Sequence, residues 1–256
     1  MNSSLLDVPF DTTANSGGSR AAADSLIVAL DYSSAAEAMA LVDGLEGSCR
    51  WFKVGLELYL SAGNGIVAAL KQRGYSVFLD LKLHDIPNTV ARAVRSVAAL
   101  GPDLLTVHAL GGSAMLAAAR EAADSVSGAP RLLAVTVLTS MDEAQLSATG
   151  VTASLPDEAL LLARLAENAG IEGVVCSPRE VARMRAGLRK PLIVTPGIRP
   201  AGAAVADQKR VATPGSAIVD GADYLVVGRP ITQAADPAAA AAAILGEIAG
   251  ALKTAR

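Results

Sequence analysis

The sequence predicts a single-domain (β/α)8 TIM barrel, a fold of the α/β class. Two observations lead to this prediction. From residue 25 onward, eight short apolar runs rich in β-branched residues alternate with longer stretches of helical periodicity. The short runs are almost continuously hydrophobic, which is typical of parallel strands covered on both faces. At about 28 residues for each strand–helix unit, the chain has room for eight units in one domain.

Each predicted strand is a short run, and a helical stretch follows it. Strands are expected over residues 25–30, 51–55, 76–82, 104–109, 132–139, 173–177, 192–197 and 224–229. Helices are expected over residues 33–46, 56–74, 86–101, 112–126, 156–170 and 178–188, with a last one from Pro237 to about Leu252. Residues 200–217 form a long connection between the seventh strand and a short helix expected before the eighth strand, and such a connection is typical of a lid on the catalytic face.

A doubly wound sheet is the alternative for such an alternating chain. That fold usually has fewer strands and a glycine-rich first turn. Residues 30–34 read LDYSS and lack a G-x-G-x-x-G pattern, which favours the barrel. Residues 1–22 are rich in Ser, Asn and Thr and lack the features of a secretory signal, so we expect a loosely docked arm before a barrel domain of residues 23–256.

Composition excludes several classes of protein. At 52% hydrophobic and 18% charged residues, the chain is neither disordered nor collagen-like. A net charge of −3 indicates no nucleic-acid partner, and no apolar stretch has the length and hydrophobicity of a membrane span. The two cysteines, Cys49 and Cys176, are far apart in sequence and fit a reducing cytoplasm, where we expect the protein to be located.

Barrel enzymes carry their chemistry at the carboxyl ends of the strands. In the predicted strands those ends hold Asp31, Lys53, Asp80, Lys82, Asp85, His108, Thr139, Ser140, Arg199, Gly228 and Arg229.

Asp80 and Lys82 lie two residues apart on one predicted strand, so both side chains are expected to point inward. A structural ion pair is the alternative for such a pair. Lys53 on the neighbouring strand favours an alternating array, Lys53–Asp80–Lys82–Asp85, in which the lysines stay charged and one can donate a proton. Asp85 follows the strand end and needs a turn to reach this array, and Pro87 supports one.

The end of the eighth strand is typical of a phosphate site. Gly228 lets backbone N–H groups approach an anion, and Arg229 can grip it with two hydrogen bonds. A surface charge is the alternative for Arg229. The long connection adds Gln208, with Lys209 and Arg210 expected to be solvated. Lys53 and Lys82 stand between the acidic residues and would repel a cation, so we predict neither a metal nor a cofactor.

The string from Asp80 to Thr89, DLKLHDIPNT, resembles the signature of bacterial short-form orotidine 5′-phosphate decarboxylases. Shorter matches follow in family order over about residues 25–235. They are ALD at 29–31, FKVG at 52–55, TVHA at 106–109, LTS at 138–140, TPGIR at 195–199 and VGRP at 227–230.

The resemblance implies decarboxylation of orotidine 5′-monophosphate to UMP and CO2, the last step of de novo pyrimidine synthesis, in a homodimer. It implies that Lys82 protonates C6, Asp80 faces the substrate carboxylate and Asp85 comes from the partner subunit. The implied substrate contacts are Asp31, Lys53, Ile86 and Thr89 (the last from the partner) with Thr139 or Ser140 at the pyrimidine. Gln208, Gly228 and Arg229 hold the phosphate, and Arg199 anchors the lid.

Two other functions remain as alternatives. The first is a sister sugar-phosphate lyase similar to 3-keto-gulonate 6-phosphate decarboxylase, which shares an Asp-x-Lys-x-x-Asp motif but uses Mg²⁺ and a glutamate where this chain has Lys53. The second is a non-catalytic nucleotide-binding barrel, which would have no need of Lys82 beside Asp80.

Overall fold

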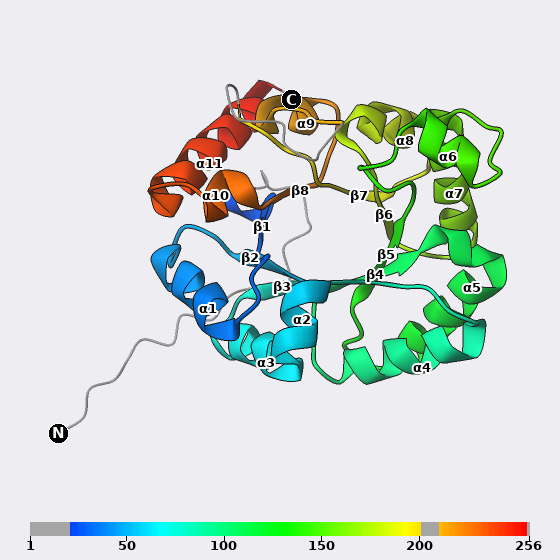
Figure 1. The fold of residues 1–256 in the computed structure, drawn as a ribbon, viewed down its shortest axis with the longest axis horizontal. Helices are drawn as coiled ribbons and strands as arrows, with labels where there is room; N and C mark the ends of the chain where they lie inside the picture. The colour runs from blue at the N-terminus through cyan, green and yellow to red at the C-terminus, as the bar shows by residue number, and fades with distance from the viewer. Residues whose placement is uncertain (1–20, 201–209, 255–256) are drawn as a thin grey trace.

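The computed structural model describes residues 21–200 and 210–254. Eight parallel strands form a closed barrel in sequence order, with β8 paired to β1. The strands are β1 (Leu26–Ala29), β2 (Trp51–Gly55), β3 (Ser76–Leu83), β4 (Leu104–His108), β5 (Arg131–Val135), β6 (Gly173–Val175), β7 (Leu192–Thr195) and β8 (Tyr224–Val227). Figure 1 shows the strands as a ring with the helices outside it, which confirms the predicted (β/α)8 barrel.

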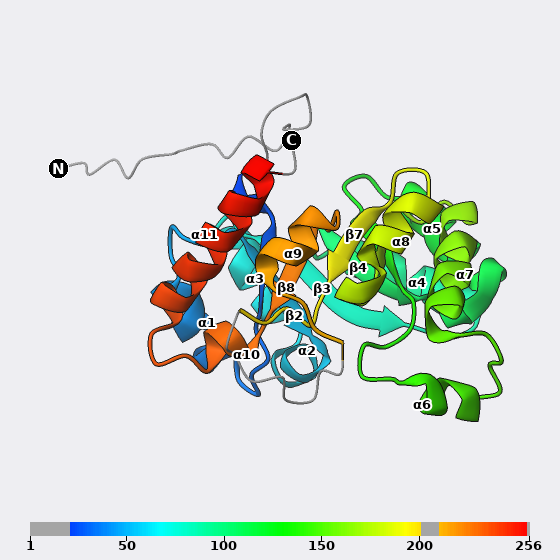
Figure 2. The same cartoon turned by 90° about the horizontal axis from the view of Figure 1, so that it is seen from above.

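The helices cover the outer face of the ring. They are α1 (Ala35–Gly44), α2 (Leu56–Ala62), α3 (Asn64–Gln72), α4 (Pro87–Ala98), α5 (Gly112–Asp124), α6 (Glu143–Ala148), α7 (Leu155–Asn168), α8 (Val181–Gly187), α9 (Pro214–Val219), α10 (Arg229–Thr232) and α11 (Pro237–Thr254). Single 3-10 turns are η1 (Ala22–Asp24), η2 (Ala109–Gly111) and η3 (Pro178–Glu180). In Figure 2, α2, α6 and α10, which each follow a strand, lie along the lower edge.

Four elements differ from the sequence expectation. The helix expected over residues 56–74 is broken at Gly63, whose φ of 64° ends α2 and begins α3. The strand expected over residues 132–139 ends at Val135, so Thr139 and Ser140 lie in the turn that follows it. The short helices α6 and α10 were not predicted, because four to six residues are too few to show a helical period.

Two apolar layers hold the barrel. Inside the ring, Ile27, Phe78, Leu104 and Leu133 pack together, with Trp51 and Tyr224 in edge contact at 5.0 Å where their strands begin. The alternate residues of the strands face outward and pack against the helices in a second, larger core. The interior is therefore filled by apolar side chains at its amino end.

The amino ends of the strands carry three similar contacts, which we call the acid–base stitches. In each, an acidic residue just before an even-numbered strand accepts a hydrogen bond from a backbone N–H near the start of the preceding strand. The same acidic residue also forms an ion pair with a basic side chain on the helix that precedes the earlier of the two strands. The sets are Asp103 with Val77 and Lys71, Glu172 with Leu132 and Arg120, and Asp223 with Ile193 and Arg185. The stitches tie β3 to β4, β5 to β6 and β7 to β8 at the end opposite the predicted site.

Some expectations concern parts of the chain outside the described residues. The predicted arm over residues 1–22 lies there except for its last two residues, and so do Gln208 and Lys209. Within the described ranges, no helix has the length and hydrophobicity needed to span a membrane.

Candidate active site

Four charged side chains from three adjacent strands meet at the carboxyl end of the barrel. We call Asp31, Lys53, Asp80 and Lys82 the charged cluster. Lys53 Nζ donates to Asp31 Oδ1 at 3.0 Å and lies 3.8 Å from Asp80 Oδ2. Lys82 Nζ lies 2.9 Å from both oxygens of Asp80. Charges alternate from Asp31 through to Lys82, so every neighbour of a lysine here is an acid.

Thr106 of β4 joins the cluster from the next strand. Its side chain is fully buried, donates to Asp80 Oδ1 at 2.9 Å and accepts the backbone N–H of Lys82 at 2.8 Å. One hydroxyl therefore fixes both Asp80 and the main chain of Lys82. Thr106 is not among the predicted site residues, although it alternates with outward-facing Leu105 and Val107 and is thus a polar residue on the inward face.

Lys82 reaches the cluster through an irregular backbone. Its φ is 49°, and among the described residues it is the one non-glycine with a positive φ. The pairing of β3 with β4 shifts register between Leu79 and Leu83, as at a bulge. The expected meeting of Asp80 and Lys82 is found, but regular strand alternation is the wrong reason for it. A left-handed residue costs about 1–3 kcal/mol and persists where its surroundings hold it, here the Thr106 hydroxyl and the Asp80 carboxylate.

Asp80 stays ionised because of its two lysines. Burial favours the neutral acid, but Lys53 and Lys82, together with the hydrogen bonds from Lys82 and Thr106, outweigh it and lower the pKa of Asp80 below its ordinary value. At neutral pH the cluster therefore presents a carboxylate between two ammonium groups.

Gly55 makes room for the Lys53 amine. A Cβ at position 55 would lie 2.8 Å from Lys53 Nζ, which is closer than real Cβ contacts. Gly228 has a similar place, since a Cβ there would lie 3.2 Å from Asp31 Oδ2. Gly228 was predicted at the phosphate, and Gly55 is not among the predicted site residues. Both glycines allow the backbone to pass close to the charged cluster.

Asp85 stands apart from the cluster of its own chain. It is exposed, and its Oδ1 accepts the N–H of Ile86 at 2.6 Å. Among the ion pairs of the described residues, none joins Asp85 to a lysine. Ile86 is 67% exposed, and Thr89 at the start of α4 is exposed too. One chain thus supplies three members of the predicted array, Lys53, Asp80 and Lys82, and Asp31 extends this array through its contact with Lys53.

Arg199 and Arg229 lie near each other at the ends of β7 and β8. Arg199 is buried, and its Nη1 donates to the carbonyl of Ile198 at 2.8 Å. Burial and the positive charge of Arg229 both lower the pKa of Arg199. Two guanidinium groups that repel each other at the mouth of a barrel make a site suited to a dianion.

Arg210 contradicts its sequence expectation. Instead of being solvated, it is 8% exposed and forms an ion pair with Glu180, which is 2% exposed. Glu180 lies 30 residues earlier in the chain, so no local pattern could signal the pair.

His84 and His108 stack at 5.2 Å beside the cluster. His108 Nδ1 accepts the N–H of Leu110 at 3.3 Å. Burial, His84 and Lys82 lower the pKa of His108 from 6.5 to about 4, so its ring is neutral at pH 7.

We expect the His108 ring resonances in NMR spectra to stay constant from pH 8 down to about 5. The folded state binds fewer protons than the unfolded state between pH 6.5 and about 4, so stability falls as the pH drops through that window. His108→Gln should remove this part of the acid sensitivity in thermal unfolding. Titration of the His108 ring near pH 6.5 would contradict the assignment.

The chain matches one known family over most of its length. Residues 24–244 match the model of the Orotidine 5′-phosphate decarboxylase / HUMPS family. The chain belongs to this family. The predicted family, and with it the assignment as a carbon–carbon lyase, is therefore confirmed.

Individual relatives of this decarboxylase family agree with the match. The chain is 54% identical over 230 residues to the orotidine 5′-phosphate decarboxylase of Halorhodospira halophila, covering 88% of this chain and 96% of the relative. For the protein of that name from Sodalis glossinidius the identity is 52%, with coverages of 89% and 91%. The crystal structure of the Lactobacillus acidophilus decarboxylase superposes with a TM-score of 0.78 at 40% identity, covering 88% and 99% of the two chains. The Pyrococcus horikoshii structure gives 0.70 at 27%, with the same coverages.

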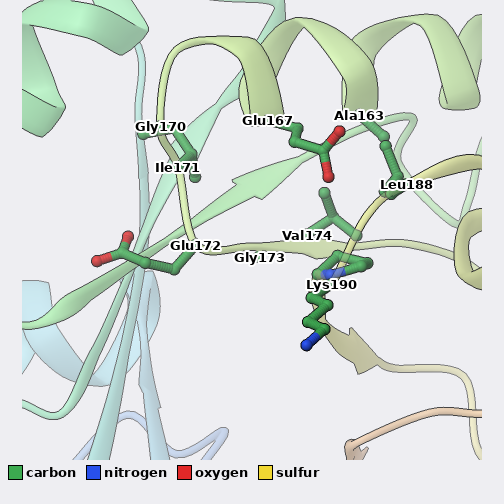
Figure 3. Close-up of a pocket in the computed structure, with 10 residues that line it drawn as sticks. Ala163, Glu167, Gly170, Ile171, Glu172, Gly173, Val174, Leu188 and Lys190 are labelled. Carbon is green, nitrogen blue, oxygen red and sulfur yellow. The ribbon is translucent and has the colours of Figure 1, made fainter.

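A cavity of about 160 Å³ lies elsewhere on this decarboxylase-family barrel (Figure 3). Its lining comes from the end of α7 and from the residues that lead into β6 and β7, with the Glu167 carboxylate directed into it. The neighbouring Arg189 backbone N–H donates to that carboxylate at 2.7 Å. The cavity is thus at the amino ends of the strands, away from the charged cluster, and we assign no chemistry to it.

Proposed function

We propose that this protein converts orotidine 5′-monophosphate to UMP and CO2, the last step of de novo pyrimidine synthesis, with Lys82 as the proton donor. The observation that supports this most is the placement of Lys82 Nζ 2.9 Å from both oxygens of Asp80 at the mouth of the barrel. The family match and the names of the relatives support the substrate.

The chemistry requires a fixed cation beside C6. When the bond from C6 to the carboxylate breaks, its electron pair stays on C6 in an in-plane orbital that the ring cannot delocalise. Lys82 then gives a proton from Nζ to C6 and regains one from solvent. Because the charge becomes concentrated at C6 in the transition state, the ammonium stabilises that state more than the spread-out substrate carboxylate. Asp80, held ionised, faces that carboxylate and holds the Lys82 amine in place through two short contacts.

The remaining contacts are the ones that the resemblance to the decarboxylase family implies. Asp31 and Lys53 bind the ribose hydroxyls, with Ile86 at the edge of the site and Thr89 reaching in from the partner subunit. Thr139 or Ser140 meets the pyrimidine from the turn after β5. Gln208, Gly228 and Arg229 hold the phosphate, and Arg199 anchors the connection that follows β7.

We further propose a homodimer in which Asp85 completes the charged cluster of the other subunit. Asp85 is exposed and has no lysine partner among the described residues of its own chain. Large apolar side chains are exposed in the segments that follow β2, β3 and β4. They are Leu56 (48%), Leu60 (79%), Ile86 (67%) and Leu110 (56%). Exposed apolar side chains in segments that follow three adjacent strands, one of which leads to Asp85, favour a second copy of the chain as the group that covers them.

The direct test is to mix the purified protein with orotidine 5′-monophosphate in EDTA. We expect loss of orotidylate absorbance and formation of UMP and CO2 at a rate that EDTA does not change. Activity that needs added Mg²⁺ would favour the sister lyase, and tight UMP binding without turnover would favour a nucleotide-binding barrel.

Arg229→Ala is expected to raise KM for orotidylate by about 100-fold while slowing turnover less, because the lost charge-assisted hydrogen bonds act on the remote phosphate. Steady-state kinetics measure both constants. Addition of guanidinium ion should restore part of the lost activity. An unchanged KM would remove Arg229 from the phosphate site.

A further inference from the structure

The Arg210–Glu180 pair connects three loops at the carboxyl end of the barrel. Glu180 ends η3, which follows β6, and Arg210 lies in the long connection after β7. Arg210 Nη1 pairs with Glu180, while its Nη2 donates to the carbonyls of Leu138 at 3.1 Å and Val137 at 3.4 Å in the turn after β5. One guanidinium therefore holds segments that are 30 and 72 residues away in sequence.

Glu180 is itself held in place. Its second carboxylate oxygen accepts the N–H of Ser177 at 3.0 Å, and the Ser177 hydroxyl accepts the N–H of Arg179 in return at 3.3 Å. This capping box leaves Glu180 Oε1 directed at Arg210. A buried carboxylate with such fixed partners gives the arginine a defined position, which a solvated acid would not.

The segment around Arg210 is also tied to β7. Ala212 pairs with Ile198 in an isolated bridge, and its carbonyl accepts the N–H of Arg199 at 2.9 Å. The guanidinium of Arg210 therefore extends from a backbone fixed beside Arg199 to the turn that carries Leu138. That turn continues into Thr139 and Ser140, the residues placed at the pyrimidine ring.

We propose that Arg210 is a positioning residue that sets the turn of residues 137–140 against the pyrimidine ring of the substrate. This inference rests on the proposed function, because it assigns Arg210 to one end of that same site. The carbonyls of Val137 and Leu138 are the points of attachment, and Arg210 acts through them without touching the substrate. The phosphate is held by Arg229 at the end of β8, so loss of the Arg210 attachment is expected to act on the pyrimidine end of the substrate more than on the phosphate end.

The geometry requires an arginine. Nη1 of the planar fork pairs with the carboxylate and Nη2 donates to both carbonyls, an arrangement that a single lysine amine cannot reproduce. Arg210→Lys keeps the charge that Glu180 needs and removes the bridge to the turn. Loss of the charge itself would leave Glu180 buried without a cation, which destabilises a fold strongly.

The test compares two ligands that differ by the pyrimidine. Inhibition constants for UMP and for ribose 5-phosphate are measured with the full-length wild-type protein and with Arg210→Lys. We expect UMP binding to weaken about tenfold, while ribose 5-phosphate binding changes by less than about twofold. In a Thr139→Ala/Ser140→Ala background, the Arg210→Lys loss for UMP should shrink to less than about twofold, because the two changes then remove the same contact.

Two controls separate a positioning role from a structural one. Arg183→Lys alters an exposed arginine pair with Asp157 on the helix layer and should leave both constants unchanged. Arg210→Met/Glu180→Met removes both buried charges together, so the comparison does not depend on the folding of a single variant. Equal weakening of both ligands, or no change in either, would overturn the inference. A wild-type protein that neither turns over orotidylate nor binds UMP would instead overturn the proposed function.

Discussion

Lys82→Met is expected to reduce decarboxylation by at least about 10⁴-fold, because it removes both the proton donor and the fixed cation beside C6. Met has nearly the same length and lacks the charge. Loss of orotidylate absorbance, with chromatographic detection of UMP, measures the effect. Binding of UMP should be weakened far less than turnover, since the product has no developing charge at C6.

The matched control is Lys71→Met. Lys71 also pairs with an acid, Asp103 at 2.8 Å, but at the amino end of the barrel, so the variant should retain turnover close to that of the wild type. Circular dichroism and thermal unfolding of both variants exclude a folding defect. Turnover by Lys82→Met near the wild-type rate would refute the proposed mechanism.

Asp85→Asn is expected to abolish most activity and to be rescued by mixing with Lys82→Met. If Asp85 serves the cluster of the other subunit, each mixed dimer has one site with both native residues. Random exchange of subunits should then restore about a quarter of the wild-type sites. Activity is followed after the two inactive variants are mixed at equal concentration, unfolded and refolded together.

Mixing Lys82→Met with Lys82→Ala supplies the control, because no combination of those subunits contains a native Lys82. Activity in that mixture would indicate contamination. If mixing Asp85→Asn with Lys82→Met restores nothing, while hybrid dimers are shown to form by mass spectrometry, Asp85 does not act across the interface.

The barrel could be predicted because its strands and helices follow a strong alternating pattern. The charged residues could be predicted because they interrupt that pattern. Lys53, Asp80 and Lys82 interrupt strands that are otherwise apolar, and a charge at such a position is costly without a partner. Thr106 and Gly55 carry no charge and do not stand out in this way. The hydrogen bond from Thr106 to Asp80 and the space that Gly55 leaves for Lys53 depend on the packing of β2, β3 and β4 side by side.

The backbone of Lys82 and the burial of Arg210 could not be predicted, for a different reason. The bulge in β3 is a property of its register with β4, which skips between Leu79 and Leu83, and the residues of β3 do not encode that register. Arg210 lies in a long connection, and a charged residue in such a segment is usually exposed to solvent. Its burial depends on Glu180 and on two carbonyls contributed by other loops.

The acid–base stitches link the strands in pairs at the amino end of the barrel. The first pair is tied differently, by Arg50 and Asp24 at 2.7 Å. Because these links lie at the amino ends of the strands, side chains at the carboxyl ends can be exchanged for new specificity while the links are kept. The contacts that link the strands in pairs and the residues of the candidate active site thus lie at opposite ends of the barrel, so substitutions in one set need not affect the other.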